Sequence, residues 1–202
     1  MYTDKELTFR TNRLTIRPLN YDDHKGWIEG FENRYPSQYK HDKGKINMEE
    51  CNETWFIELV DKQQTLIKQD DTFIFGIFLE NGKHVGMLDI KVLSRSDFQW
   101  GECGYFLHNQ FWNQGYAFEA MKEVISQCYK TLNLHRIEAH INVDNEPSKK
   151  LIKKLGFEFE VLRKNFIYEF EVLRKNFIYE FDEWTDNEVY YINLHNEKLI
   201  ES

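Results

Sequence analysis

A polar loop with one glycine, running straight into a helix, is the segment of this sequence best suited to chemistry. The loop begins at Gln110 and reaches Gly115, and Ala117 lies just inside the helix. Small residues at 115 and 117 let backbone N–H groups approach an anion, and a helix N-terminus adds unpaired amides and partial positive charge. The pattern favours a pyrophosphate site, although a glycine at a helix start is also typical of an ordinary turn. It matches neither the P-loop nor the dinucleotide-binding fingerprint.

The sequence around this loop contains five short motifs in order. They are Glu102-Cys103-Gly104-Tyr105, Trp112–Ala117, Leu132–Ala139, Asn145–Ser148 and Leu155-Gly156-Phe157. Together with Arg13–Pro18 near the start, they resemble the GNAT N-acetyltransferase superfamily, in the branch of ribosomal-protein N-terminal (alanine/serine) acetyltransferases. The resemblance covers roughly residues 8 to 195, apart from a duplicated segment.

This resemblance implies an α/β (α+β) architecture, the GNAT fold. Its mixed, mostly antiparallel central sheet is splayed in the middle, between the Glu102 strand and the Arg136 strand, with helices on both faces. Acetyl-CoA is the implied co-substrate, and no metal is expected. The implied CoA-binding residues are Phe106 and Leu107 for the pantetheine arm and, for the pyrophosphate, the backbone of Asn113, Gln114, Gly115, Tyr116, Ala117 and Phe118.

Acetyl transfer to an amine requires a base for the amine and a proton for the leaving thiol. The resemblance assigns the base to Glu102, because that strand position carries a general base in several superfamily members; a salt-bridged or solvated glutamate is the alternative. Many relatives use a tyrosine at the position of Ile152, which cannot donate a proton. Ser148 is then the candidate donor, or else it only satisfies amides of the first helical turn. Asn145 is either a helix cap or a pantetheine ligand, and an amide near Leu107 can donate to the thioester oxygen.

Several other conspicuous side chains are interpreted as structural. Tyr105 and Trp112 are expected to pack rather than to contact substrate, and His135 is expected to be a structural histidine. The lysines within 149–154 can meet CoA phosphates, but such a run is typical of a solvated helix face.

Composition limits the class of protein. With 202 residues, 41% of them hydrophobic, the chain is expected to form a single N-acetyltransferase domain, 1–202. No apolar run is long enough to span a membrane and the start lacks signal-peptide character, so a cytoplasmic location without a membrane partner is expected. A net charge of −8 disfavours nucleic acid and favours a cationic amine. Cys51, Cys103 and Cys128 are expected to be reduced thiols, the first and last in helix cores.

Hydrophobic periodicity gives the expected order of elements: strand, helices, three strands, helix, strand, helix, strands. Strands are expected at 11–18, 72–80, 84–93, 99–108, 136–143, from 157 onward and at 189–194. Helices are expected after the Asp22-Asp23 cap, from a capping box at Asn47, across 117–128 and across 145–155. Asn81-Gly82 predicts a type I′ hairpin turn.

Residues 158–168 recur without change at 169–179. Because strand side chains alternate between faces, an odd shift puts Phe159 and Phe170 on opposite faces of an unbroken strand. One copy is therefore expected to form the native strand, while the other loops out, forms an extra hairpin or swaps to a partner. The Arg-Lys-Asn triplets at 163–165 and 174–176 are the expected turns.

The leading functional hypothesis is an acetyl-CoA-dependent N-acetyltransferase acting on a protein N-terminal amine. A second is transfer to a small-molecule amine such as a polyamine, an aminoglycoside or a metabolite. A third is an acyl-CoA-binding module that has lost catalysis. A homodimer is one expected assembly, by analogy with the family that the sequence resembles and because a last strand at 189–194 at the end of the sheet needs covering.

Overall fold

The computed structural model describes residues 2–3, 5–169 and 183–194. Within these residues eight strands form one sheet in the order β1-β2-β3-β4-β5-β6-β8-β7. Only β5 and β6 run parallel among the paired strands described, so the expected mixed, mostly antiparallel sheet is confirmed. The strands are β1 (Phe9–Arg10), β2 (Leu14–Arg17), β3 (Thr72–Leu79), β4 (His84–Ser94), β5 (Trp100–Leu107), β6 (Arg136–Asn142), β7 (Glu158–Glu169) and β8 (Glu183–Asn193). The helices are α1 (His24–Glu32), α2 (Glu53–Lys68), α3 (Tyr116–Lys130) and α4 (Glu146–Lys154), with 3-10 turns η1 (Tyr21–Asp23) and η2 (Asn109–Phe111).

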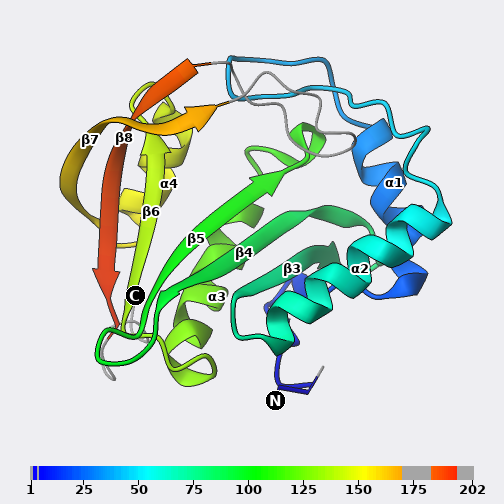
Figure 1. The fold of residues 1–202 in the computed structure, drawn as a ribbon. Helices are drawn as coiled ribbons and strands as arrows, with labels where there is room; N and C mark the ends of the chain where they lie inside the picture. The colour runs from blue at the N-terminus through cyan, green and yellow to red at the C-terminus, as the bar shows by residue number, and fades with distance from the viewer. Residues whose placement is uncertain (1, 4, 170–182, 195–202) are drawn as a thin grey trace.

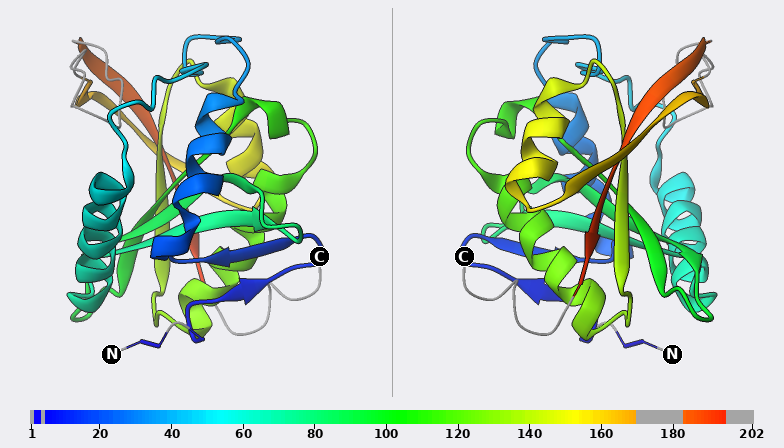
Figure 2. Two further views of the ribbon diagram at one scale, coloured as in Figure 1. Left: turned by 90° about the vertical axis from the view of Figure 1, so that its right-hand side faces the viewer. Right: turned by 90° about the vertical axis from the view of Figure 1, so that its left-hand side faces the viewer.

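Helices cover both faces of the sheet. The helix α2 lies on one side, and α3 and α4 lie on the other (Figures 1 and 2). The helix α1 shares the α2 side, where Phe31 of α1 packs on Phe106 of β5. Each face has its own cluster of buried apolar side chains. The predicted apolar stripe of α3 is confirmed, because Ala120, Met121, Val124, Ile125 and Cys128 are all buried.

The sheet is split between β5 and β6. Their parallel pairing runs only from Trp100 opposite Arg136 to Glu102 opposite Glu138. Beyond Glu102 the two strands diverge (Figure 1). Among the described residues, no strand pairs with the β6-facing edge of β5 from Cys103 to Leu107. The predicted splay is confirmed, and it exposes main-chain donors and acceptors in the middle of the molecule.

Local signals placed several element ends wrongly. The helix α2 begins at Glu53, where the Asn52 side chain accepts from an amide of the first turn, and not at the predicted box on Asn47. Cys51 consequently lies before this helix. In the β3–β4 turn only Gly82 has positive φ, and Asn81 does not, so the turn is not type I′. Asp23 is the N-cap residue of α1, where the cap was expected, but its side chain makes no cap hydrogen bond there and instead forms a capping box with Asn20 at η1.

The first copy of the duplicated segment lies in β7. The strand continues through 163–165 with a register shift against β8 and a left-handed residue at Asn165, so the predicted turn there is wrong. The second triplet, 174–176, lies outside the described residues. The strand β8 is also not at the sheet edge, because it lies between β6 and β7. The argument for a dimer from an uncovered 189–194 therefore does not hold.

Candidate active site

The start of α3 presents open backbone amides. Gly115 is its N-cap residue, with φ of 82° and no side-chain cap hydrogen bond. That left-handed conformation favours glycine, and it turns the loop so that the next amides lie along the helix axis. Among the described residues, no acceptor is hydrogen-bonded to the amides of Tyr116, Ala117 or Phe118. The partial positive charge of the helix end is thus available to an anion.

A cavity of about 1000 Å³ runs from the start of α3 through the split in the sheet. It reaches the α1–α2 face, where Asp89 and Gln63 line it. Of the residues predicted to bind CoA or to act in catalysis, those lining the cavity are Phe106, Leu107, Asn113, Gly115, Tyr116, Ala117, Phe118, Asn145 and Ser148. Gln114 and Glu102 do not line it. The Gln114 carbonyl instead accepts from the Arg13 guanidinium at 3.0 Å.

A hydroxyl pair lies on the α3–α4 side of the cavity. The Tyr105 hydroxyl donates to the Ser148 hydroxyl at 3.1 Å. Burial raises the pKa of Tyr105 to about 12, so the phenol stays protonated at neutral pH. The Asn145 side chain accepts from the Ser148 amide at 3.3 Å as a helix cap, and Asn145 also lines the cavity, so it satisfies both interpretations. Ile152 is buried in the core.

The lysines within 149–154 were expected either to meet CoA phosphates or to form a solvated helix face, and two of them differ in position. Lys154 lines the cavity, with its Nζ 4.4 Å from the centre of the Phe118 ring, close to the start of α3. The Lys149 ammonium instead donates to the Val143 carbonyl at 2.6 Å and pairs with Glu146. One cation of the run therefore lines the cavity near the start of α3, and another is structural.

A row of acidic groups follows the α1–α2 face of β4, β5 and β6. His140 links two of them, because its Nδ1 lies 3.3 Å from Glu102 and its Nε2 lies 3.0 Å from Glu138. Asp89 lies across from Gly104, two residues along β5 from Glu102. Burial, and then the charge of Glu102, raises the pKa of Asp89 to about 6. Sequence reasoning missed Asp89, because only the register of β4 against β5 brings it beside Glu102.

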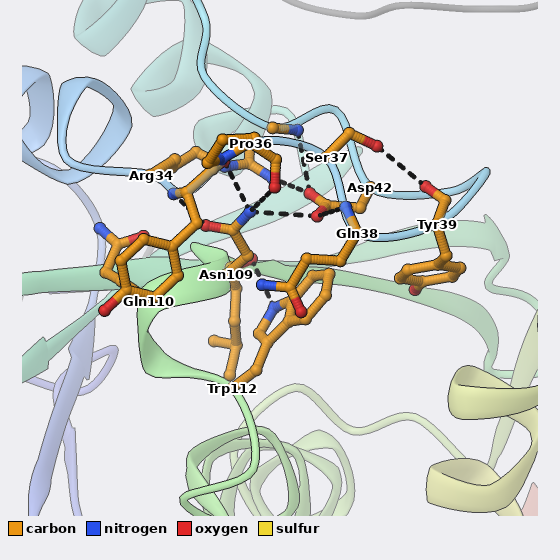
Figure 3. A network of polar contacts seen from close by, with 12 residues as sticks. Arg34, Pro36, Ser37, Gln38, Tyr39, Asp42, Asn109, Gln110 and Trp112 are labelled. Atoms are coloured by element: carbon orange, nitrogen blue, oxygen red, sulfur yellow. Dashed lines mark hydrogen bonds and ion pairs between the residues drawn. The ribbon is translucent and has the colours of Figure 1, made fainter.

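The loop between α1 and α2 is fastened to η2 by a buried polar network (Figure 3). The Asp42 carboxylate accepts from Arg34 at 3.1 Å and from the Asn109 amide at 3.0 Å. Asn109 also accepts from the Tyr35 amide at 2.7 Å and donates to its carbonyl at 2.9 Å. From η2 the chain continues to Trp112, whose Nε1 donates to the Leu107 carbonyl at 3.0 Å. The α1–α2 loop and the loop before α3 are therefore held as one unit.

The arrangement of open helix amides, split sheet and through-going cavity agrees with similarities to known proteins. Residues 13–158 match the acetyltransferase (GNAT) domain family. The chain belongs to this family. YoaA of Bacillus subtilis, named an uncharacterized N-acetyltransferase, is 29% identical to this GNAT chain over 156 residues, 76% of this chain and 85% of that protein. The ribosomal protein uS5–alanine N-acetyltransferase of Escherichia coli is 31% identical over 101 residues, 50% of this chain and 52% of that enzyme.

A solved structure shares the fold of this GNAT chain. Mycobacterium smegmatis RimJ in complex with CoA-disulfide has a TM-score of 0.70 and 20% identity, over 94% of this chain and 84% of that one. GNAT acetyltransferases use acetyl-CoA, and this chain is an acetyl-CoA-dependent N-acetyltransferase. Within the part of the chain that the structure describes, no helix is long and apolar enough to cross a bilayer, and no group of three metal-binding side chains converges.

Proposed function

We propose that this acetyltransferase transfers the acetyl group to the N-terminal amine of a protein or peptide. The cavity that passes through the split sheet supports the proposal, because it joins the open amides at the start of α3 to the α1–α2 face, where the Asp89 carboxylate lines it. Similarity to the Escherichia coli enzyme, which is named for ribosomal protein uS5 alanine, supports a protein N-terminus as the acceptor. An α-amine is also easier to deprotonate at neutral pH than a lysine side chain.

The residues present fit acetyl-CoA. The amides from Asn113 to Phe118 would hold the diphosphate, with Lys154 as a nearby cation. Among the described residues no strand pairs with the β6-facing edge of β5 at Phe106 and Leu107, where the Leu107 carbonyl accepts from Trp112 Nε1. This edge would hydrogen-bond the pantetheine amides, with Asn145 lining the same cavity. When bound, acetyl-CoA supplies an activated acetyl thioester.

The two sides of the cavity have complementary proton chemistry. On the α4 side, Ser148 with the Tyr105 hydroxyl behind it would give a proton to the departing sulfur. On the α1–α2 side, Glu102 would take up the proton of the amine through water, since it lies beside the cavity rather than in its wall. These roles agree with a net transfer of one proton from amine to thiol.

A panel of acceptor amines tests this function. The purified chain is first melted with and without acetyl-CoA, and ligand at 100 times its Kd is expected to stabilise the fold by about 2.7 kcal/mol. Thiol release is then measured with peptides that begin with alanine or serine, with the same peptides blocked by N-terminal acetylation, and with spermidine. Turnover only with the free-amine peptides supports the proposal. Turnover of spermidine alone indicates a small-amine enzyme, and binding without turnover of any amine indicates a binding module.

A further inference from the structure

We infer that Asp89 and Gln63 form the subsite for the acceptor ammonium, and that Asp89 is the first group to accept its proton. Both line the cavity on the α1–α2 face, Asp89 from β4 and Gln63 from α2. The ligand class is a primary amine in its protonated form. This inference rests on the proposed function and names the amine-binding part of that site.

The Asp89 carboxylate lacks a hydrogen-bonding partner. Among the residues that the structure describes, no group donates a hydrogen bond to it and no cation forms an ion pair with it. A partly buried carboxylate in that state is destabilised relative to water. Space for it is made by Gly104 on β5, because a Cβ there would lie 2.7 Å from an Asp89 oxygen. The carboxylate therefore sits over the split strand with its acceptor positions free for a ligand.

Gln63 provides a second, independent acceptor. Its side chain is 7% exposed, and its Oε1 has no hydrogen-bond partner in the described part of the chain. An unsatisfied buried carbonyl oxygen costs about 1–3 kcal/mol unless a donor reaches it. An ammonium has three N–H donors, and the oxygens of Asp89 and Gln63 can accept two of them. Thr72 and Ile74 of β3, which line the same cavity, carry no charge.

The charged groups around Asp89 set when it can act. Glu102 of β5 opposes its ionisation, and Lys91 of β4, which lies opposite Glu102, favours it. From the α1–α2 loop, Lys43 and His41 line the same cavity. Loss of the Glu102 charge should therefore make Asp89 easier to ionise.

The step balances in protons and electrons. The ammonium gives one proton to Asp89, and the nitrogen lone pair forms the new bond to the acetyl carbon while the carbon–sulfur bond breaks. The sulfur keeps that electron pair and takes a proton from the Ser148 hydroxyl, which takes one from Tyr105. The nitrogen of the tetrahedral adduct loses a second proton through water toward Glu102, and water returns one proton to Tyr105. Ammonium and thioester thus become amide and thiol, and one proton is released to solvent from the carboxylates.

The first test compares variants of the full chain with an alanine-starting tetrapeptide as substrate. Because a positioned base contributes about 10²–10⁴-fold, we expect Asp89→Asn to lower kcat/KM by about 100-fold or more, with the acetyl-CoA thermal shift retained. Gln63→Leu should raise the KM for the peptide roughly tenfold, the loss of about one hydrogen bond to a charged group. Asp97→Asn and Gln64→Leu, which remove the same groups away from the cavity, should match the parent chain.

The pH profile separates a chemical role from a structural one. The acid limb of kcat/KM should move to lower pH in Glu102→Gln, and it should disappear from the residual activity of Asp89→Asn. A parent-like rate in Asp89→Asn, or an unshifted acid limb in Glu102→Gln, would overturn the inference.

A readout that needs no turnover distinguishes this inference from the proposed function. In chain labelled with ¹³C at aspartate carboxyls, the signal lost in Asp89→Asn is that of Asp89. Adding the tetrapeptide with CoA should lower the pH at which this signal titrates, and the N-acetylated peptide should not. A peptide that is acetylated without moving the signal refutes the subsite alone. A signal that moves with spermidine but not with the peptide keeps the subsite and rejects the protein N-terminus.

Discussion

The Asp89 carboxylate lowers the stability of the fold when it is ionised, and its oxygens are free to accept hydrogen bonds from a ligand. Burial raises the pKa of Asp89 to about 6 in the folded chain, above the ordinary aspartate value of 3.8, so the unfolded state holds the proton less tightly. Ionisation therefore destabilises the fold at a pH above about 6, and this penalty fades as the pH falls toward the unfolded value. Residues that lower stability in this way are found where function requires them.

Replacing Asp89 by Asn should consequently stabilise the protein while it lowers turnover. We expect the free energy of unfolding in urea to rise by about 2 kcal/mol at pH 8, and by less than half of that at pH 4.5. Asp97→Asn, an exposed control, should show neither change. An Asp89→Asn chain that is less stable than the parent at pH 8 would mean that the carboxylate has a structural partner.

Individual site residues were the part of the structure that the sequence predicted least well. Glu102 stands out in a motif, whereas Asp89 does not, yet the cavity wall contains Asp89 and not Glu102. Their proximity depends on Asp89 pairing with Gly104, and a shift of one residue would point Asp89 to the other face. Ser148 could be singled out from its motif, but its contact with Tyr105 depends on how α4 packs on β5.

At the scale of elements, the start of α3 depends on the left-handed turn at Gly115. A side chain there imposes backbone strain of about 1–2 kcal/mol and crowds the amides that face the anion. Gly115→Ala should weaken acetyl-CoA binding about tenfold or more in calorimetry. Gly82→Ala is the matched control, since Gly82 has φ of 80° and lies in the exposed β3–β4 turn. Equal binding by both variants would exclude the α3 amides as the diphosphate site.

A buried histidine pair joins the ends of β4 and β5 under α1. His84 Nδ1 lies 3.0 Å from His108 Nε2, and burial lowers the pKa of His84 to about 3 and of His108 to about 2. Both folded values lie below 6.5, so the unfolded chain binds more protons once the pH falls through that value. Stability is therefore highest above pH 6.5 and is lost progressively on acidification.

We expect the free energy of unfolding to fall by about 2 kcal/mol between pH 7.5 and 5.5. The double variant His84→Asn with His108→Gln keeps polar atoms in place, but its two new side chains cannot titrate. Most of the fall in the free energy of unfolding between the two pH values should therefore vanish, whatever the absolute stability of the variant. Denaturant unfolding at the two pH values measures both slopes. An unchanged slope in the variant would assign the acid sensitivity to other groups.

Periodicity predicted elements well where one face is clearly apolar, and poorly at their ends. The apolar stripe of α3 was sufficient to predict this helix, because its five buried residues lie on one face only in a helical conformation. The start of α2 was not, since Asn47 and Asn52 both look like caps. Met48 and Cys51 are buried against α1, which favours a turn there and delays the helix to Glu53. Hydrophobic periodicity does not predict the order of strands in a sheet, so the position of β8 between β6 and β7 is known only from the structure.

At the scale of the whole molecule, the second copy, 169–179, begins at the last residue of β7 and lies before β8 in the sequence. The strand β7 contains the whole first copy and ends at Glu169, the first residue of the second copy, which pairs with Glu183 of β8. Removing 169–179 would put Glu180 into the place of Glu169, because the next residue after either copy's Tyr is a glutamate. The strand sequence of β7 would then be unchanged, and Phe181 with Asp182 would close the hairpin as a short loop.

A chain without 169–179 should therefore keep its fold and its acetyl-CoA thermal shift. Fewer residues between β7 and β8 lower the entropic cost of closing the hairpin by about 1–2 kcal/mol. The new turn lacks the Asn-Gly pair that favours a tight hairpin, and this offsets part of the gain. The free energy of unfolding should therefore be unchanged or higher. Circular dichroism, urea unfolding and the melting shift measure the three quantities. Deleting 158–168 gives the same chain as deleting 169–179, because the two copies are identical, so it cannot serve as a control. The matched control instead replaces 169–179 by a Gly/Ser linker of equal length. If the deletion alone lost acetyl-CoA binding, the second copy would be part of the working protein rather than an insertion that the β7–β8 hairpin tolerates.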